Sequence, residues 1–408
     1  GKTVFVSGAL PGEQALARKT RGRKSFDEAI ALEIENPSPD RVDAKCPHYQ
    51  ICGGCSLQHL SEERQIDHKQ SVLVELFEHH AGVKPTELMS PLTASPWHYR
   101  RRARRGVKFV EKKGGILVGF REKASPYIAD IHTCEVLHES VGHRLDELRS
   151  LIEKLSIKSK IPQLEVAVGD DATAIIVRHL EPFTSEDLEC LNDFQGESGI
   201  ALFLQPKGED SVHPLNERTR SLHYTLDDLR FEFTPNNFIQ VNQAINRKMI
   251  AAVIENLHLT TNDRVLDLFC GLGNFTLPIA KNAGSVHGVE GDSALVALAR
   301  SNAVANGIHN ATFAEMNLAD PALLSGLQLA DYNKMLLDPP RSGAEEIISS
   351  GPLQHIELLV YVSCNPVTLA RDAGHLLQTH GFSLAKLGVM DMFPHTSHVE
   401  SMAIFARD

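Results

Sequence analysis

The sequence lacks long hydrophobic segments and targeting signals. No apolar run reaches the roughly 18 residues that a transmembrane helix needs. Residues 1–5 do not begin the basic and then apolar pattern of a secretory signal. Internal repeats and low-complexity tracts are missing as well. We therefore expect a cytoplasmic protein without a membrane partner.

Cysteine is sparse: seven residues in a chain of 408 exclude a small disulfide scaffold. Hydrophobic residues make up 42% of the chain and charged residues 23%, which excludes a disordered or collagen-like protein. The length predicts two or three domains, each able to bury its own core. Without a secretion signal the cysteines should stay reduced, so a group of them indicates metal binding or catalysis.

Positive charge is in deficit overall but concentrated in one segment. The net charge of −11 disfavours a polyanion partner, yet residues 98–123 hold ten basic and two acidic side chains, a local balance of +8. Such a patch is a candidate footprint for phosphates, and the alternative is a solvated strand edge. The predicted RNA contacts in it are Arg100, Arg101, Arg102, Arg104 and Arg105.

The pattern of elements predicts three regions: residues 1–43, 44–235 and 236–408. The first two are mainly β, with a helix at 62–79 that is expected to pack on the third region, and another near 185–191. From about residue 245, helices alternate with strands at 265–269, 285–290, 311–315, 335–338 and 358–363. This alternation predicts an α/β, Rossmann-like domain built on a parallel sheet.

A glycine-containing turn at 267–275 follows the first of these strands. Gly271 and Gly273 let the backbone approach a ligand closely, and Glu290 at the end of the next strand suits the two hydroxyls of a ribose. The turn lacks the third glycine of the dinucleotide fingerprint. It resembles motif I of S-adenosylmethionine-dependent methyltransferases, whereas the plain alternative is a structural turn.

Two further strands end in candidate ligand contacts. Asn317 lies where methyltransferases place an adenine contact, or else is a turn residue. Asp338 begins an Asp-Pro-Pro elbow at the carboxyl end of the sheet, where open α/β sheets bind ligands. Enzymes that methylate exocyclic nitrogens carry an aromatic residue next, and Arg341 stands there instead.

Cys364 follows the last of these strands and precedes a helix predicted at 368–375. The field of that helix is expected to lower the thiol pKa and make Cys364 a nucleophile, although a free cysteine is more often a buried apolar residue. A thiolate that adds to C6 of uracil activates C5 toward a methyl donor, and a base must then remove the C5 proton. We predict Glu400 as that base, with His398 as the runner-up and His395 also nearby.

These residues together resemble the RNA uracil-5 methyltransferase family over most of the chain. The matching segments are residues 238–242, 267–275, 337–341, 363–372 and 392–400. The resemblance implies Cys364 as nucleophile, Glu400 as base and S-adenosylmethionine as cofactor. It also implies cofactor contacts at Gln240, Phe269, Gly271, Gly273, Asn274, Glu290, Asn317 and Asp338, and stacking of Phe238 on the target base.

A four-cysteine set points to one branch of this family. Cys46, Cys52, Cys55 and Cys134 can hold either Zn²⁺ or an iron–sulfur cluster, and their spacing does not decide between the two. The set resembles that of the iron–sulfur branch acting on 23S rRNA, which implies a [4Fe–4S] cluster with a structural, RNA-orienting role. Residues 1–43 resemble the second half of that branch's OB-like TRAM domain.

Other functions remain open at this point. A uracil-5 methyltransferase of tRNA or of another rRNA site is one, although the tRNA branch lacks the four cysteines. A cytosine-5 enzyme would often carry a second cysteine, and the Asp-Pro-Pro elbow has none. A non-catalytic RNA-binding module with a degenerate methyltransferase fold, and a redox sensor, are the others. No protein partner is implied.

Overall fold

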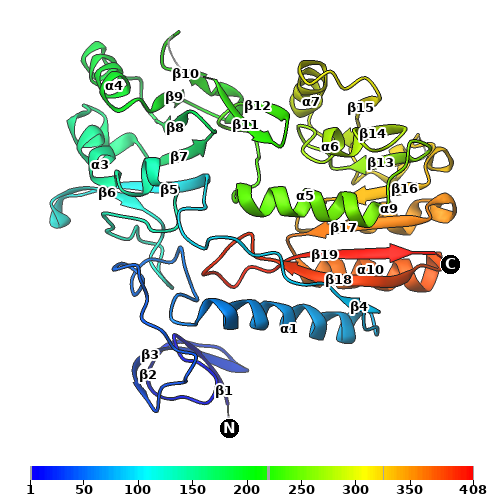
Figure 1. The fold of residues 1–408 in the computed structure, drawn as a ribbon. Helices are drawn as coiled ribbons and strands as arrows, with labels where there is room; N and C mark the ends of the chain where they lie inside the picture. The colour runs from blue at the N-terminus through cyan, green and yellow to red at the C-terminus, as the bar shows by residue number, and fades with distance from the viewer. Residues whose placement is uncertain (1, 218–220, 325, 408) are drawn as a thin grey trace.

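The structure, a computed structural model, describes residues 2–217, 221–324 and 326–407. Within these residues the chain forms a small N-terminal sheet, a central six-stranded sheet, a two-stranded hairpin and a C-terminal eight-stranded sheet (Figure 1). Short 3-10 helices lie at η1 (Glu111–Lys113), η2 (Lys158–Lys160), η3 (Glu209–Ser211), η4 (Leu329–Asp331) and η5 (Leu353–His355). No described helix is long and apolar enough to span a bilayer.

The N-terminal sheet has little core of its own. Its strands are β1 (Thr3–Ser7), β2 (Gln14–Gly22) and β3 (Phe26–Glu35), in the order β1-β3-β2. Every residue of β2 is exposed, and Ala29 is the one buried residue of the three strands. An ion pair between Arg41 and the buried carboxylate of Glu13 (2.5 Å) connects the sheet to the chain that follows it. This ion pair holds the pKa of Glu13 at about 2.

Helix α1 (Glu62–His80) packs on the C-terminal region, far from it in sequence. It contacts helix α10 (Pro366–His380) and strand β18 (Ser383–Met390), along which it runs in Figure 1. Leu73 and Phe77 are fully buried in the same core as the C-terminal strands. The buried Lys69 pairs with Asp391 at 2.7 Å. Since an unpaired buried charge is costly, this ion pair fixes how α1 sits on the sheet.

The central sheet runs in the order β10-β9-β8-β7-β5-β6. Its strands are β5 (Arg102–Val110), β6 (Gly115–Gly119), β7 (Gln163–Val168), β8 (Thr173–Arg178), β9 (Ala201–Gln205) and β10 (His213–Pro214), followed by the hairpin β11 (Leu222–Leu226) and β12 (Leu229–Phe233). Helices α2 (Glu139–Gly142), α3 (Leu145–Lys154) and α4 (Ser185–Ser198) accompany it. Sequence analysis did not predict α3, and α4 extends seven residues past the predicted end at Leu191.

The C-terminal sheet has the order β15-β14-β13-β16-β17-β19-β18-β4. Its strands, besides β18, are β4 (Glu87–Leu88), β13 (Arg264–Leu268), β14 (Ser285–Glu290), β15 (Ala311–Glu315), β16 (Lys334–Leu337), β17 (Leu358–Ser363) and β19 (Glu400–Ala406). The helices, besides α10, are α5 (Gln243–Leu257), α6 (Thr276–Ala280), α7 (Ser293–Ala305), α8 (Pro321–Leu324) and α9 (Glu345–Ser350). Strands β13 to β17 are parallel, which confirms the predicted α/β sheet.

Candidate active site and cysteine cluster

The strand register brings Cys364 and Glu400 together. Strand β17 pairs antiparallel with β19, with Ser363 opposite Ser401. Cys364 comes directly after Ser363 and Glu400 directly before Ser401, so both lie at the same end of this strand pair, and the charge of Glu400 raises the pKa of Cys364. The predicted nucleophile and the predicted base therefore meet at the carboxyl end of β17, although 36 positions separate them in the sequence.

Acidic groups at this edge of the sheet hold their protons to unusually high pH. Burial, with the nearby Asp338 carboxylate, raises the pKa of Glu400 to about 8. Burial alone raises the pKa of Asp338, directly after β16, to about 7. Arg341 and Lys69 act in the opposite direction on Glu400. A carboxyl group with a pKa near the working pH is suited to both accepting and donating a proton.

The predicted lowering of the Cys364 pKa is wrong. Burial, followed by the negative charges of Glu400 and Asp338, raises the pKa of the Cys364 thiol to about 11. Arg341 and the backbone lower it by less. Desolvation and two carboxylates thus outweigh the N-terminal field of α10. In the free protein Cys364 is therefore a thiol at neutral pH, and it must lose a proton before it can act as a nucleophile.

The two histidines near Glu400 occupy different positions. His395 is 2% exposed, its ring stacks at 4.0 Å from the ring of Trp97, and its carbonyl accepts from the amides of Ser56 and Leu57. His395 therefore anchors the backbone of the loop at residues 56–57. His398 is exposed, and its Nδ1 lies 3.1 Å from a guanidinium nitrogen of Arg341. Neither stands opposite Cys364 in the register of β17 and β19.

The turn after β13 is shaped for close approach of a ligand. Phe269, Gly271 and Gly273 all have positive φ, at +66°, +55° and +93°. The Glu290 carboxylate accepts hydrogen bonds from the amides of Gly271 (3.1 Å) and Gly291 (2.7 Å), which fixes it against the turn. A Cβ atom at Gly271 would meet nothing within 4 Å, so the chain leaves open space there.

Asp267 lies under this turn, fully buried. Its Oδ2 accepts from the Thr276 hydroxyl at 2.5 Å, while its Oδ1 has no hydrogen-bond partner among the described residues. Burial raises its pKa to about 7, and the charges of Asp338 and Glu290 act in the same direction. Three carboxyl groups therefore share one edge of the sheet.

The other predicted cofactor contacts are partly engaged within the protein. Asn274 exchanges two side-chain hydrogen bonds with Asn246 (2.9 and 3.0 Å) and accepts a third from the Tyr224 hydroxyl. Gln240 lines a small cavity together with Tyr224 and Asn246. The Asn317 side chain accepts a hydrogen bond from the amide two residues later, at 3.1 Å. This is the arrangement of a turn residue, the alternative to an adenine contact. The pairing of Asn246 with Asn274 was not predicted.

Phe238 lies in the segment between β12 and α5. Its side chain is 66% exposed, which is unusual for a large apolar ring. Its ring is therefore free to meet a ligand.

The four cysteines of the predicted cluster line one small cavity of about 20 Å³. Burial raises the pKa of Cys46, Cys52 and Cys55, that of Cys55 to about 12, and neighbouring thiols of the set add to each shift. Between Cys52 and Cys55, a Cβ atom at Gly54 would lie 2.7 Å from the Phe120 ring. Only glycine fits there without displacing that ring.

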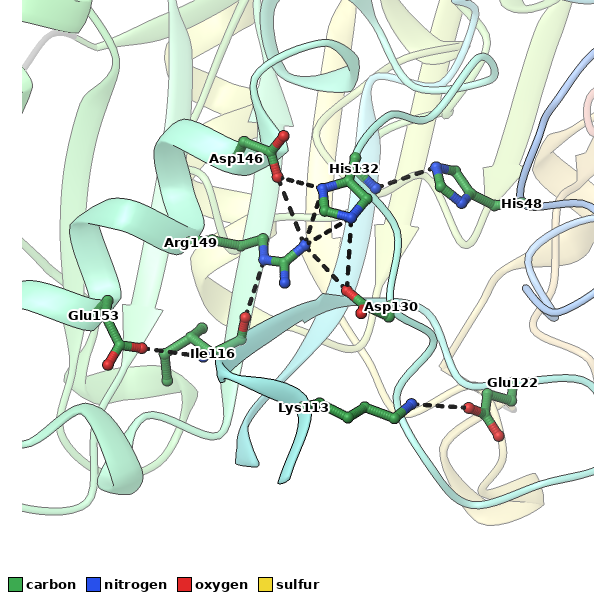
Figure 2. A network of polar contacts seen from close by, with 9 residues as sticks. All are labelled: His48, Lys113, Ile116, Glu122, Asp130, His132, Asp146, Arg149 and Glu153. Carbon is green, nitrogen blue, oxygen red and sulfur yellow. Dashed lines mark hydrogen bonds and ion pairs between the residues drawn. The ribbon is translucent and has the colours of Figure 1, made fainter. Parts of the chain in front are cut away.

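A polar network holds the two cysteine-bearing loops against α3 (Figure 2). The amide of His132 donates to His48 Nε2 (3.2 Å), so the loop with Cys134 is joined to the loop with Cys46. The His132 ring contacts Asp146 of α3 at 2.7 Å, and Arg149 of the same helix pairs with Asp130 at 3.0 Å. No motif in the sequence indicated this bracing.

Most of the arginines predicted to contact RNA are buried or bound to other groups of the protein. Arg105 is completely buried, and none of its nitrogen atoms has a hydrogen-bond partner among the described residues; its guanidinium lies 4.4 Å from the Phe120 ring centroid. An RNA contact at Arg105 is therefore excluded in this structure, because β5 turns the side chain inward. Arg101 pairs with Asp170 (2.7 Å) and Arg104 with Glu165 (3.0 Å).

Arg100 and Arg102 are also held by the chain. Arg102 donates to the carbonyls of Pro235 and Asn236. Arg100 donates to the carbonyl of Arg102 at 3.0 Å, and its guanidinium lies 5.8 Å from the Phe393 ring centroid. These two arginines join the central sheet to the segments around the active site.

Comparisons with known proteins match the whole chain. Two curated relatives are named "23S rRNA (uracil(1939)-C(5))-methyltransferase RlmD": one from Alkalilimnicola ehrlichii is 49% identical, and one from Alcanivorax borkumensis is 47% identical. Each alignment covers 100% of this chain and 92% of the relative.

The fold also has a counterpart among solved structures. The Pyrococcus abyssi tRNA (uracil-54, C5)-methyltransferase, solved with S-adenosyl-L-homocysteine, aligns with a TM-score of 0.75 at 23% identity over 99% of this chain and 96% of that one. The family model described as tRNA (uracil-5-)-methyltransferase matches residues 61–408. The chain therefore belongs to the uracil-5 methyltransferase family and has its α/β methyltransferase fold.

Proposed function

We propose that this protein transfers a methyl group from S-adenosylmethionine to C5 of a specific uridine in 23S rRNA. The observation that carries the proposal is that Cys364 and Glu400 lie at the same end of the β17–β19 pair, close enough for the charge of Glu400 to raise the pKa of Cys364. The choice of 23S rRNA over tRNA rests on relatives of 46–49% identity that carry that substrate in their names. The four cysteines favour the same branch.

The proposed reaction uses Cys364 and Glu400 in turn. The Cys364 thiol first gives its proton to solvent, and the thiolate then adds to C6 of the uracil, which makes C5 nucleophilic. After methylation, the Glu400 carboxylate accepts the C5 proton, and the electrons of that C–H bond expel Cys364. A pKa of about 8 makes Glu400 a better proton acceptor than an ordinary carboxylate. Phe238, whose ring is 66% exposed, is proposed to stack on the base after it leaves its RNA helix.

The residues of the turn fit S-adenosylmethionine, which would supply the methyl group as part of a sulfonium cation. Asp267, Glu290 and Asp338 place three carboxyl groups at the edge where a cation would bind, and a bound cation would favour their ionised forms. The unpaired Asp267 Oδ1 and the open space at Gly271 leave room for ligand contacts. We assign binding to Gln240, Phe269, Gly271, Gly273, Asn274, Glu290, Asn317 and Asp338 on this basis.

We also propose a [4Fe–4S] cluster bound by the four cysteines, in preference to zinc. A zinc ion with Zn–S bonds of about 2.3 Å holds its thiolates roughly 3.8 Å apart. Among the described residues, the one group of three or more ligand atoms all within 4.8 Å of one another is His98, Glu135 and His143, and the four thiols form no such group. The wider spacing fits a cluster, in which iron and sulfide ions stand between the thiolates.

Positive charge around the same cavity supports an anionic cluster. Arg105 has no carboxylate partner among the described residues, and it lowers the pKa of Cys52. The Lys123 ammonium lies 3.5 Å from the Tyr49 ring centroid. Burial lowers the pKa of Lys123, and the charges of Cys55, Cys52 and Cys46 act in the opposite direction. Two buried or half-buried cations balance the net charge that four thiolates bring to such a site. We propose that the cluster is structural and orients the RNA.

The division of the chain into domains is part of the same proposal. Residues 1–43 would form a partial TRAM domain, 44–235 the domain that carries the cluster, and 236–408 the catalytic domain. The three-stranded sheet β1-β3-β2 is compatible with part of an OB-like barrel.

A mechanism-based trap tests the proposed function. The protein is incubated with S-adenosylmethionine and 5-fluorouridine-substituted 23S rRNA fragments, and separately with substituted tRNA. Because fluorine at C5 cannot leave as a proton does, a denaturation-resistant adduct should form with the rRNA alone. Cys364→Ala should form none, while Cys190→Ala, which changes a cysteine outside the site, should react as the wild type does. An adduct with tRNA only would exclude 23S rRNA as the substrate.

A further inference from the structure

A second cavity, separate from the active site and from the cysteine cavity, opens beside β5 and β6. Its volume is about 850 Å³, within the range of pockets that bind organic ligands. Its lining includes Arg104, Lys108, Lys112, Lys113, Arg121 and Tyr127. Strand β6 is the edge of the central sheet, so no further strand covers this side among the described residues.

The charges of this cavity are largely unpaired. Lys108, Lys112 and Arg121 are exposed and make no ion pair with any residue that the structure describes. Lys113 pairs with Glu122 at 3.8 Å, and Figure 2 draws this ion pair. Glu122 is the one acidic residue in the lining, against five basic ones. Of the basic segment found in the sequence, the exposed cations without an ion pair among the described residues of this cavity's lining are therefore Lys108, Lys112 and Arg121, while Arg104 lines the cavity but pairs with Glu165.

An exposed aromatic ring accompanies the cations. Tyr127 lines the cavity and is 72% exposed, more than any other large hydrophobic side chain of the described residues except Val304. Its amide is held by the Ser125 hydroxyl at 3.2 Å, and a backbone bridge joins Arg121 to Ile128. A fixed loop thus presents a free ring beside free cations, which is the combination that binds single-stranded nucleic acid.

Strand β5 links this cavity to the active site. Arg100, just before the strand, contacts Phe393 in the segment that leads to Glu400. Lys108 follows Arg100 by eight positions on the same extended chain, a distance of about 26 Å at roughly 3.3 Å per residue. A ligand that reaches both places must be long and must run along the protein surface.

We propose that this cavity binds a single-stranded segment of the RNA substrate, several nucleotides away from the target uridine. Lys108, Lys112 and Arg121 would contact its phosphates, and Tyr127 would stack on one of its bases. The inference rests on the proposed function, since it assumes an RNA substrate. Phosphates with an unstacked base match both features of the cavity, whereas an acidic protein partner would use the charges alone.

Binding of fluorescein-labelled single-stranded oligouridine, measured across a salt series, tests this inference. The variant Lys112→Ala/Arg121→Ala should reduce the salt slope by about 1.4, from two phosphate contacts at about 0.7 each. The control Lys154→Ala/Lys207→Ala removes the same charge from exposed sites outside the cavity and should keep the wild-type slope. Equal slopes for the two double variants would overturn the assignment.

Tyr127 supplies the test of base stacking. Tyr127→Ala should weaken oligouridine binding about tenfold, whereas Tyr127→Phe, which keeps the ring, should bind as the wild type does. A different result would overturn the inference in favour of an acidic partner: Lys112→Ala/Arg121→Ala weakens binding, Tyr127→Ala does not, and polyglutamate competes with oligouridine for the cavity.

The trap with 5-fluorouridine separates this inference from the proposed function. If wild-type protein forms the adduct but the cavity variants bind oligouridine normally, this inference fails alone. If wild-type protein forms no adduct with any uridine-containing RNA, both the proposed function and this inference fail.

Discussion

The ionisation of Cys364 offers a direct test of how the active site is built. At pH 8, a thiol with a pKa of about 11 is about 0.1% ionised, against about a quarter for an ordinary thiol with a pKa of about 8.5. Iodoacetamide reacts with the thiolate, so Cys364 in the free protein should be alkylated about 200-fold more slowly than an unperturbed cysteine of equal access.

Removing one of the two neighbouring carboxylates should speed this alkylation. Glu400 and Asp338 both raise the Cys364 pKa, Glu400 by the larger amount. Glu400→Gln is expected to lower that pKa, and each unit of the decrease gives about a tenfold higher rate at pH 8. Asp338→Asn should act in the same direction with a smaller gain.

Peptide-resolved mass spectrometry from pH 7 to pH 11 measures this rate for each cysteine separately. Cys190, half-buried on α4, serves as an internal reference because its rate should not respond to Glu400→Gln. If the alkylation rate of Cys364 in the wild type has its midpoint below pH 8, the argument that burial and two acidic groups raise the pKa of this thiol is refuted. An unchanged Cys364 rate in both variants would refute the electrostatic part alone.

Three further predictions concern the base, the cluster and the pH dependence of stability. Glu400→Gln should accumulate a covalent RNA adduct on a denaturing gel, because no group accepts the C5 proton; a variant that binds RNA without an adduct would argue against its role. Arg105→Met should lower the bound iron or shift the cluster to a more negative reduction potential, while Arg104→Met should change neither. Between pH 6.5 and pH 8 the unfolding free energy in urea should fall, because Asp267 and Asp338, with pKa values of about 7, and Glu400, at about 8, bind more protons folded than unfolded. Asp338→Asn should flatten that fall, and an equal slope in the variant would contradict the assignment.

The sequence located much of the site because the site lies at strand ends. Strands at 285–290, 311–315 and 358–363 were predicted at the residues where they occur; Glu290 ends the first, and Asn317 and Cys364 follow the other two within two residues. Antiparallel pairing of β19 with β17 was not predicted, since alternating helices and strands indicate only parallel neighbours. That pairing brings Cys364 and Glu400 to the same end of the sheet.

Burial explains where sequence reasoning failed. Ala103, Arg105 and Val107 alternate inward on β5, so Arg105 occupies a core position within a run of exposed and paired arginines. A count of charges along the chain does not register that alternation. The Cys364 pKa was misjudged for the same reason: helix polarity is visible in a sequence, whereas desolvation depends on what packs around the thiol.

The packing of α1 and β4 on the C-terminal sheet has a consequence for how this chain can be divided. Strand β4 forms the border of that sheet beyond β18, and α1 covers α10, yet both come before the central sheet in the chain. The central sheet is in effect inserted into the catalytic fold. A fragment of residues 236–408 would leave β18 as a bare edge and uncover the apolar face against which Phe77 packs. Such a fragment is expected to self-associate, so a separable catalytic unit must include residues from about 61 to 90.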